Sequence, residues 1–203
     1  MENLMKGSIL IIGTQTDFGR SLAAVFSREG WEVFSPDDFA RIKNLNILAD
    51  TTDFTGGSDD GLNGEIIETS FRENVIKPMQ TLEKFLPFLD AGGTGDSKGA
   101  SKRLFYVSSA CASINATRDT HGFAYKMSKA ALHQFLQMVH NRLFSRYTLR
   151  LFDPMTGKIP PETAAESAFL YITRRRGTEN HDPLRDDENT LVLRDAEGRA
   201  HSW

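Results

Sequence analysis

Apolar residues in this chain form short continuous runs that alternate with segments of helical spacing. The runs at 8–12, 31–35, 45–49, 103–108, 147–152 and 190–194 contain mainly branched aliphatic and aromatic residues, as expected for strands buried in a sheet. Helical spacing is found at 19–26, 65–89, 125–136 and 161–173. Strands that alternate with helices in this way predict a doubly wound α/β fold with a parallel sheet.

The connections between these elements differ in length and composition. Residues 36–42 leave room for only a turn or two of helix before the next strand. Residues 51–63 and 90–101 are rich in glycine and small polar residues, so we expect loops there. Pro78 predicts a kink or a local adjustment in the helix at 65–89. No internal repeat or second domain is evident, and residues 1–203 are predicted to form a single domain.

Composition excludes several classes of function. The chain has 203 residues, of which 39% are hydrophobic and 25% charged, as in ordinary globular proteins. A net charge of −3 gives no electrostatic reason to bind nucleic acid or an anionic membrane surface. The apolar run at 9–12 is too short for a signal peptide or a membrane span. Cys111 is the only cysteine, which excludes an internal disulfide and favours the cytoplasm. The histidines lack Cys or acidic partners at metal-ligand spacing, so no metal site is predicted.

Candidate chemistry centres on Tyr125 and Lys129, which share one face of a predicted helix. An ammonium beside a phenol favours the phenolate and lowers the phenol pKa, which makes a usable proton donor near neutral pH. Ser108 and Ser109 end the preceding strand and would bring hydroxyls to the same place. Chance alone gives roughly 0.2 Tyr-x-x-x-Lys pairs in such a chain. A surface helix with a packed tyrosine and a solvated lysine is therefore the competing interpretation.

Several motifs, taken in chain order, resemble the short-chain dehydrogenase/reductase family. The segment Gly-Thr-Gln-Thr-Asp-Phe-Gly at 13–19 resembles that family's glycine-rich first turn. Asn74 matches an asparagine of its long helix, Ser109 its catalytic serine, and Tyr125–Lys129 its Tyr-x-x-x-Lys motif. Residues 191–198 resemble its last strand and turn. The resemblance runs through most of the chain and implies a Rossmann-like dinucleotide-binding domain.

The resemblance also implies an activity, that of an NAD(P)-dependent oxidoreductase interconverting a small carbonyl and an alcohol. In that scheme Tyr125 is the general acid and base, and Lys129 lowers its pKa and contacts the nicotinamide ribose. Ser109 polarises the carbonyl. Asn74 holds a water that links Lys129 to solvent, or is simply a structural amide. The implied cofactor-binding residues are Gly13, Thr14, Phe18, Gly19, Asp37 and Lys129.

Glycines of the first turn and acidic residues after the second strand favour a dinucleotide cofactor on physical grounds. The glycines permit a tight turn and a close approach of a pyrophosphate to a helix N-terminus, although a turn and a close helix–strand contact explain them without a ligand. Asp37 or Asp38, just past the second strand, would accept a hydrogen bond from a ribose 2′-hydroxyl, which favours NAD. Both carboxylates could instead cap a helix, and Arg41 leaves NADP open.

Departures from the family pattern fall mainly on cofactor binding. Asp17 stands where the second glycine of the first turn is expected, and residues 50–53 replace an Asn-Asn-Ala-Gly segment. The short connection at 36–44 predicts a reduced adenosine-binding region. The alternative function is therefore a non-catalytic sensor or interaction protein of the same fold that has lost productive cofactor binding. The apolar helices at 65–89 and 125–136 resemble those through which relatives pair, so a homodimer or homotetramer is expected.

Overall fold

A seven-stranded sheet forms the centre of the described part of the chain. The computed structural model describes residues 6–55, 62–91, 102–115, 118, 121–173 and 191–201. The strands are β1 (Ser8–Ile12), β2 (Glu32–Phe34), β3 (Ile47–Asp50), β4 (Lys102–Val107), β5 (Tyr147–Asp153), β6 (Leu193–Asp195) and β7 (Ala200–His201), in the sheet order β2-β1-β3-β4-β5-β6-β7. All neighbouring strands are parallel except β6 and β7. The predicted α/β fold class is thus confirmed.

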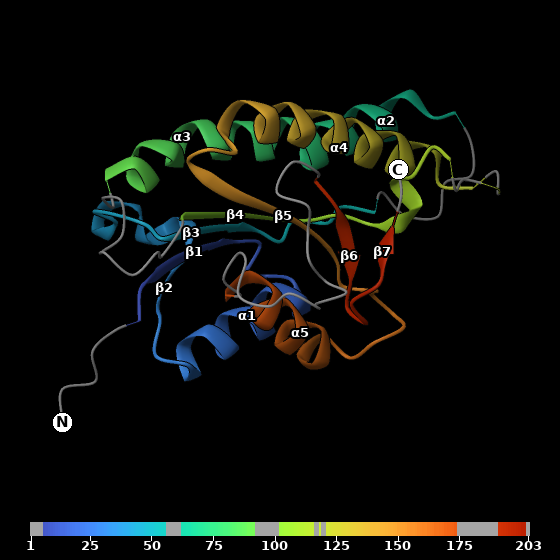
Figure 1. Cartoon of the computed structure of the whole chain (residues 1–203). Coiled ribbons are helices and arrows are strands. Elements are labelled where there is room, and N and C mark those ends of the chain that lie inside the picture. Colours follow the sequence, from blue (N-terminus) through green and yellow to red (C-terminus); the bar gives the residue numbers. More distant parts are fainter. Residues whose placement is uncertain are drawn as a thin grey trace.

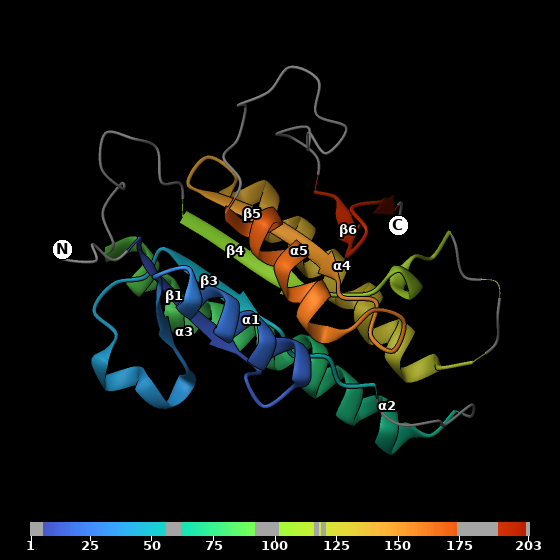
Figure 2. The ribbon, with the colours of Figure 1, turned by 90° about the horizontal axis from the view of Figure 1, so that it is seen from below.

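Helices cover both faces of this sheet (Figures 1 and 2). On one face lie α1 (Asp17–Arg28) and α5 (Pro161–Thr173), and on the other lie α2 (Gly64–Phe71), α3 (Lys77–Ala91) and α4 (Phe123–Leu143). Residues along β1 alternate between the two layers: Ile9 packs with the α1 and α5 side chains, and Leu10 with those of α3 and α4. Both cores are apolar, so the sheet is buried on both faces, as its continuous apolar runs predicted.

The connection between β2 and β3 is as short as the sequence predicts. It contains only the 3₁₀ helix η1 (Pro36–Arg41), after which β3 pairs with the opposite side of β1. Within the described part of the chain, β2 is consequently the outermost strand at this edge. The short connection predicted at 36–44 is therefore present in the fold.

The predicted helix at 65–89 is divided by a π-helical turn, η2 (Arg72–Ile76), between α2 and α3. Pro78 has no N–H to donate to the carbonyl four residues earlier, and the helix widens just before it. The N–H of Lys77 donates to the carbonyl of Arg72, five residues back. Asn74 lies in this turn and is fully buried. The local adjustment expected at Pro78 thus carries a candidate site residue.

The last strands of the sheet, β6 and β7, differ from the prediction. The strand expected at 190–194 begins at Leu193, and the chain then turns back as β7, antiparallel to β6. Asp195 holds this turn, because its carboxylate accepts hydrogen bonds from the backbone of Glu197 and Arg199. A two-residue strand is too short to give a periodic signal, which is why it was not predicted. The loop residues 56–61 and 92–101, Thr190 and the last two residues lie outside the described part.

Candidate functional site

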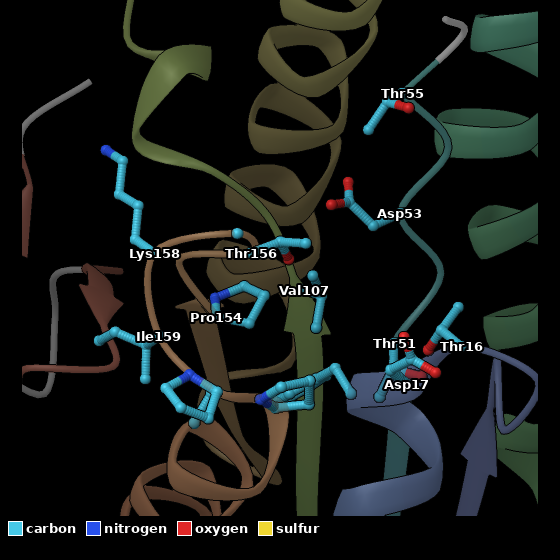
Figure 3. A pocket seen from close by; sticks show the side chains of 15 residues that line it. Thr16, Asp17, Thr51, Asp53, Thr55, Val107, Pro154, Thr156, Lys158 and Ile159 are labelled. Carbon is cyan, nitrogen blue, oxygen red and sulfur yellow. The ribbon is translucent and has the colours of Figure 1, made fainter.

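A cleft opens where the parallel strands end. The carboxyl ends of β1, β3, β4 and β5 share one edge of the sheet, and the chain segments that follow them line a cleft of about 580 Å³ (Figure 3). Crevices at this edge are where open α/β sheets bind ligands. The lining residues are Thr16, Asp17, Phe18, Thr51, Asp53, Thr55, Val107, Pro154, Thr156, Gly157, Lys158, Ile159, Pro160, Pro161 and Ala164.

Tyr125 and Lys129 lie together in the first turns of α4, as their spacing predicts. Asp53 joins them. The Tyr125 hydroxyl donates to Asp53 Oδ1 over 2.8 Å, and the Lys129 ammonium lies 2.9 Å from the same oxygen. Lys129 is fully buried and also donates to the carbonyls of Thr52 and Val107, at 3.4 and 3.3 Å. Neither Tyr125 nor Lys129 lines the cleft, whereas Asp53 does.

The pKa of Tyr125 differs from the prediction. We expected Lys129 to lower it, but the pKa of Tyr125 is raised above its ordinary value of 10, first by burial and then by the charge of Asp53. The hydrogen bond to Asp53 raises the pKa further, and a hydrogen bond with Ser109 opposes this weakly. The positive charge of Lys129 is offset by the adjacent Asp53 carboxylate. Tyr125 is therefore a stable phenol, held in its protonated form.

Asp53 is the site residue that sequence reasoning missed. The segment 50–53 was recognised only as a replacement for the expected Asn-Asn-Ala-Gly, and none of its members was assigned a role. A carboxylate three residues beyond the end of β3 lies at the carboxyl edge of the sheet, where ligands and catalytic groups gather. That position was the available signal. Its hydrogen bond to Tyr125 depends on the path of the loop, which the pattern of residues does not specify.

The two serines at the end of β4 have different surroundings. Ser108 is fully buried and shares a 2.6 Å hydrogen bond with His133 Nε2. Ser109 is half-buried and donates to Asp153 Oδ2 at 3.4 Å, and Asp153 also accepts the backbone N–H groups of Ala110 and Met155. Ser109 also forms a hydrogen bond with Tyr125, so it is the serine that lies near this tyrosine. Asp153 organises the loops on which it lies.

Asn74 fastens the loop that carries Asp53. Its Nδ2 donates to the Phe54 carbonyl at 2.8 Å and to Ser128 Oγ at 2.9 Å, and its Oδ1 accepts the Phe54 N–H at 2.9 Å. Both amide hydrogens are therefore used within the protein. Of the two roles considered for Asn74, these contacts favour the structural one. The amide links η2, α4 and the loop after β3.

The glycine turn is shaped by contacts within the protein. A Cβ on Gly19 would lie 2.2 Å from the Gly13 carbonyl oxygen, so α1 starts against the end of β1 only because this residue is glycine. Gly13 has φ +88°, and Thr16 caps α1 by accepting the N–H of Gly19 at 3.0 Å. Thr14 lies in the same turn, and the buried Phe18 stacks on Phe152.

Two acidic residues of the predicted cofactor region are directed elsewhere. Asp17 does not cap α1; its carboxylate is exposed and pairs with Arg20 at 2.7 Å. Asp38 accepts hydrogen bonds from the backbone and hydroxyl of Ser35 and pairs with Arg41. Asp38 therefore caps η1, and Asp37 beside it is exposed. Asp37 does not line the cleft, so its proposed contact with a ribose lies outside the cavity.

His133 provides a prediction on pH. Burial, aided by the charge of Lys129, lowers the pKa of His133 to about 4 from 6.5. The unfolded chain then binds more protons than the folded one between these values, so stability is lost as the pH falls from 6.5 towards 4. Measured by urea unfolding, the free energy of unfolding of the wild type should therefore decrease more steeply over this pH range than that of His133→Gln. Equal slopes for the two proteins would contradict the assignment.

Two kinds of feature are absent from the described residues. No group of three or more His, Cys, Asp or Glu side chains within them is arranged to hold a metal ion. Within the same ranges, every helix is too short or too polar to cross a membrane.

This chain is similar to known proteins in its structure. The chain matches no family model and no curated protein sequence. It resembles carbonyl reductase Sniffer of D. melanogaster at 15% identity and TM-score 0.76, over 97% of this chain and 99% of that one. A carbonyl reductase from Pseudomonas aeruginosa PAO1 in complex with NADP matches at 16% identity and TM-score 0.72, over 97% and 100%.

A third match is a proposed short-chain alcohol dehydrogenase from Burkholderia multivorans, at 17% identity and TM-score 0.74, over 97% of this chain and 99% of that one. Such low identities establish a common fold and leave the chemistry to be argued from the site. The chain therefore has the fold of the short-chain dehydrogenases and carbonyl reductases.

Proposed function

We propose that this protein is an NAD(P)-dependent oxidoreductase that interconverts a small carbonyl compound and its alcohol. The observation that carries the proposal is the meeting of Tyr125, Lys129 and Ser109 at the carboxyl edge of the sheet, beside a cleft of about 580 Å³. Solved proteins of the same fold that are described as carbonyl reductases, one of them in complex with NADP, support the assignment.

In the proposed reaction the bound nicotinamide supplies or accepts the hydride. Tyr125 gives the proton to the carbonyl oxygen. Burial and Asp53 raise the pKa of this phenol, so it keeps its proton more firmly than a donor whose pKa was lowered by Lys129 would. Ser109 orients the carbonyl by hydrogen bonding. Lys129 pairs with Asp53 Oδ1 over 2.9 Å, and Asn74 fixes the backbone that carries Asp53. Proton transfer from Tyr125 requires its hydroxyl to exchange Asp53 Oδ1 for the substrate oxygen.

The residues present fit a dinucleotide in part. The glycine turn at 13–19 presents the N-terminus of α1 to the cleft, and Asp17, which also lines the cleft, is paired with Arg20. Thr16, Phe18 and Thr51 line the cleft next to this turn. Gly13, Thr14, Phe18, Gly19 and Asp37 remain the proposed cofactor-binding residues. The lean towards NAD rests on Asp37 alone.

A second function is favoured by one specific contact. Asp53 Oδ1 receives both the Tyr125 hydroxyl and the Lys129 ammonium, so the groups proposed for chemistry are joined to a carboxylate of the protein. A non-catalytic sensor or interaction protein of this fold would be arranged in the same way. Its cleft would bind a ligand without chemical turnover.

Calorimetric titration of the protein with NADH and with NADPH separates the two functions. Binding with a dissociation constant on the order of micromolar supports the oxidoreductase and identifies the cofactor. No heat and no thermal stabilisation at millimolar nucleotide would favour the non-catalytic protein, because a bound ligand adds RT ln(1 + [L]/Kd) to stability.

If the oxidoreductase assignment is correct, Tyr125→Phe should lower kcat by about 10²–10⁴-fold, because the proton donor is lost. Cofactor binding should change little. Steady-state rates with a substrate found by screening carbonyl compounds would measure the effect. Tyr147→Phe is the matched control, since this tyrosine begins β5 at the opposite edge of the sheet and bonds to Asp90. Full activity in Tyr125→Phe would exclude the proposed acid.

Self-association is proposed for the face formed by α3 and α4. Met79, Met127 and Met138 on these helices are exposed, together with Ile76 at the end of η2. Apolar side chains gathered on neighbouring helices are typical of subunit interfaces. Light scattering should give the mass of a homodimer or homotetramer at micromolar concentration, and Met138→Glu should shift it towards the monomer. A monomeric wild type would contradict this assignment.

A further inference from the structure

The donors at the centre of the site are fully used by the protein itself. Lys129 has three N–H hydrogens, and three acceptors surround its ammonium: Asp53 Oδ1 at 2.9 Å and the carbonyls of Val107 and Thr52 at 3.3 and 3.4 Å. Tyr125 has one hydrogen, and it is directed to Asp53. A ligand that enters the cleft therefore does not meet a free donor hydrogen from either residue.

The ligand meets an acceptor instead. Asp53 lines the cleft, and both donors reach its Oδ1. Within the described residues, no protein donor bonds to its other oxygen, Oδ2. In Figure 3 the Asp53 carboxylate points from its loop into the space between Thr55, Thr156 and Val107. Its side chain is 19% exposed, which is enough for a small polar group to reach it.

The backbone that carries Asp53 is fastened by hydrogen bonds both before and after this residue. Before it, the Thr51 hydroxyl donates to the Ile12 carbonyl at 2.6 Å, and the Thr52 N–H donates to Asp50 at 3.0 Å. After it, Asn74 accepts the Phe54 N–H and donates to the Phe54 carbonyl. A loop fastened at two successive points does not readily swing aside. Asp53 is a fixed part of the site.

The other charges that line the cleft lie at its margin. Asp17 and Lys158 are exposed, and Asp17 is paired with Arg20. The remaining polar side chains of the lining are threonine hydroxyls. The polar group that a ligand encounters next to Tyr125 is consequently Asp53 Oδ2, an acceptor that can receive a hydrogen from a hydroxyl or an ammonium but has none to give to a second carboxylate.

We propose that Asp53 selects the ligand: its Oδ2 accepts a hydrogen bond from a hydroxyl or ammonium group, and it disfavours a carboxylate at the same place. The inference deepens the proposed function and rests on it in one respect, namely that the cleft is where substrate binds. The substrates sought should accordingly be amino or hydroxy carbonyl compounds rather than keto acids. Asp53 is a specificity-determining residue, and Lys129 supports it by balancing its charge.

Three probes of equal skeleton test this selection: benzylammonium, benzyl alcohol and benzoate. Binding is followed by NMR through the backbone amides of residues 51–55 in the full chain. In the wild type benzylammonium should bind about tenfold more tightly than benzoate, with benzyl alcohol between them. Asp53→Asn should remove most of this difference. Asp17→Asn, which removes the other carboxylate of the cleft lining, should preserve it.

Because Asp53→Asn leaves Lys129 without its counter-charge, Asp53→Asn/Lys129→Met is measured beside it as a neutral pair. Benzoate that binds as tightly as benzylammonium to the wild type would overturn the proposal. So would a preference that survives in both Asp53 variants, or no binding of benzylammonium and benzyl alcohol at about 20 mM. Titrations with NADH and NADPH on the same samples test the oxidoreductase assignment separately, because their outcome does not depend on the relative affinities of the three probes.

Discussion

Asp53→Ala should destabilise the protein by about 3 kcal/mol, because it leaves the Lys129 ammonium buried without its carboxylate. Lys129 is fully buried, and its remaining acceptors would be two carbonyls at 3.3 and 3.4 Å. A carbonyl dipole cannot replace the charge of a carboxylate at 2.9 Å. Removing one partner of a buried ion pair is generally worse than removing both, since the surviving charge still lacks water.

The single and double variants can therefore be compared directly. Urea unfolding should show that Asp53→Ala/Lys129→Met is more stable than Asp53→Ala, although two side chains have been replaced instead of one. Asp17→Ala is the matched control, because the Asp17 carboxylate is 81% exposed and its pair with Arg20 is solvated; it should unfold at the urea concentration of the wild type. A double variant less stable than Asp53→Ala would show that Lys129 is held by other means.

The sequence predicts best those features that depend on residues close together in the chain. Tyr125 and Lys129 lie side by side because they are four residues apart on a helix, whatever that helix packs against. The order of strands and helices follows from their apolar spacing, and the carboxyl ends of parallel strands then have to meet at one edge. The position of the site was therefore predictable.

The electrostatics of the site were less predictable, because they depend on a contact between distant segments. Asp53 reaches Tyr125 across 72 positions of sequence, through a loop whose path is fixed by Asn74 on a π-helical turn. Neither the turn nor the hydrogen bonds to Phe54 have a local signature. A lysine beside a tyrosine lowers its pKa only when the ammonium charge is not already balanced, and here Asp53 balances it.

Gly19→Ala should have the second large effect, a loss of stability at the upper end of about 1–3 kcal/mol. The added Cβ would lie 2.2 Å from the Gly13 carbonyl oxygen and 2.6 Å from Thr51 Oγ1. Neither neighbour can move away easily: the first is backbone at the end of β1, and the second donates to the Ile12 carbonyl at 2.6 Å. The start of α1 would have to shift away from β1 and from the loop after β3.

Chemical unfolding in the absence of nucleotide measures this loss. Gly64→Ala is the matched control, since a Cβ at this first residue of α2 meets nothing within 4 Å; it should be as stable as the wild type or slightly more so. If Gly19→Ala were as stable as the wild type, the turn at 13–19 would be able to move and accommodate the added Cβ. The expected loss occurs without any ligand, so Gly19 is required by the fold even if no dinucleotide binds. Reduced NADH or NADPH binding in this variant would therefore not identify Gly19 as a cofactor contact, and that question has to be decided at Thr16 or Thr51, whose side chains line the cleft.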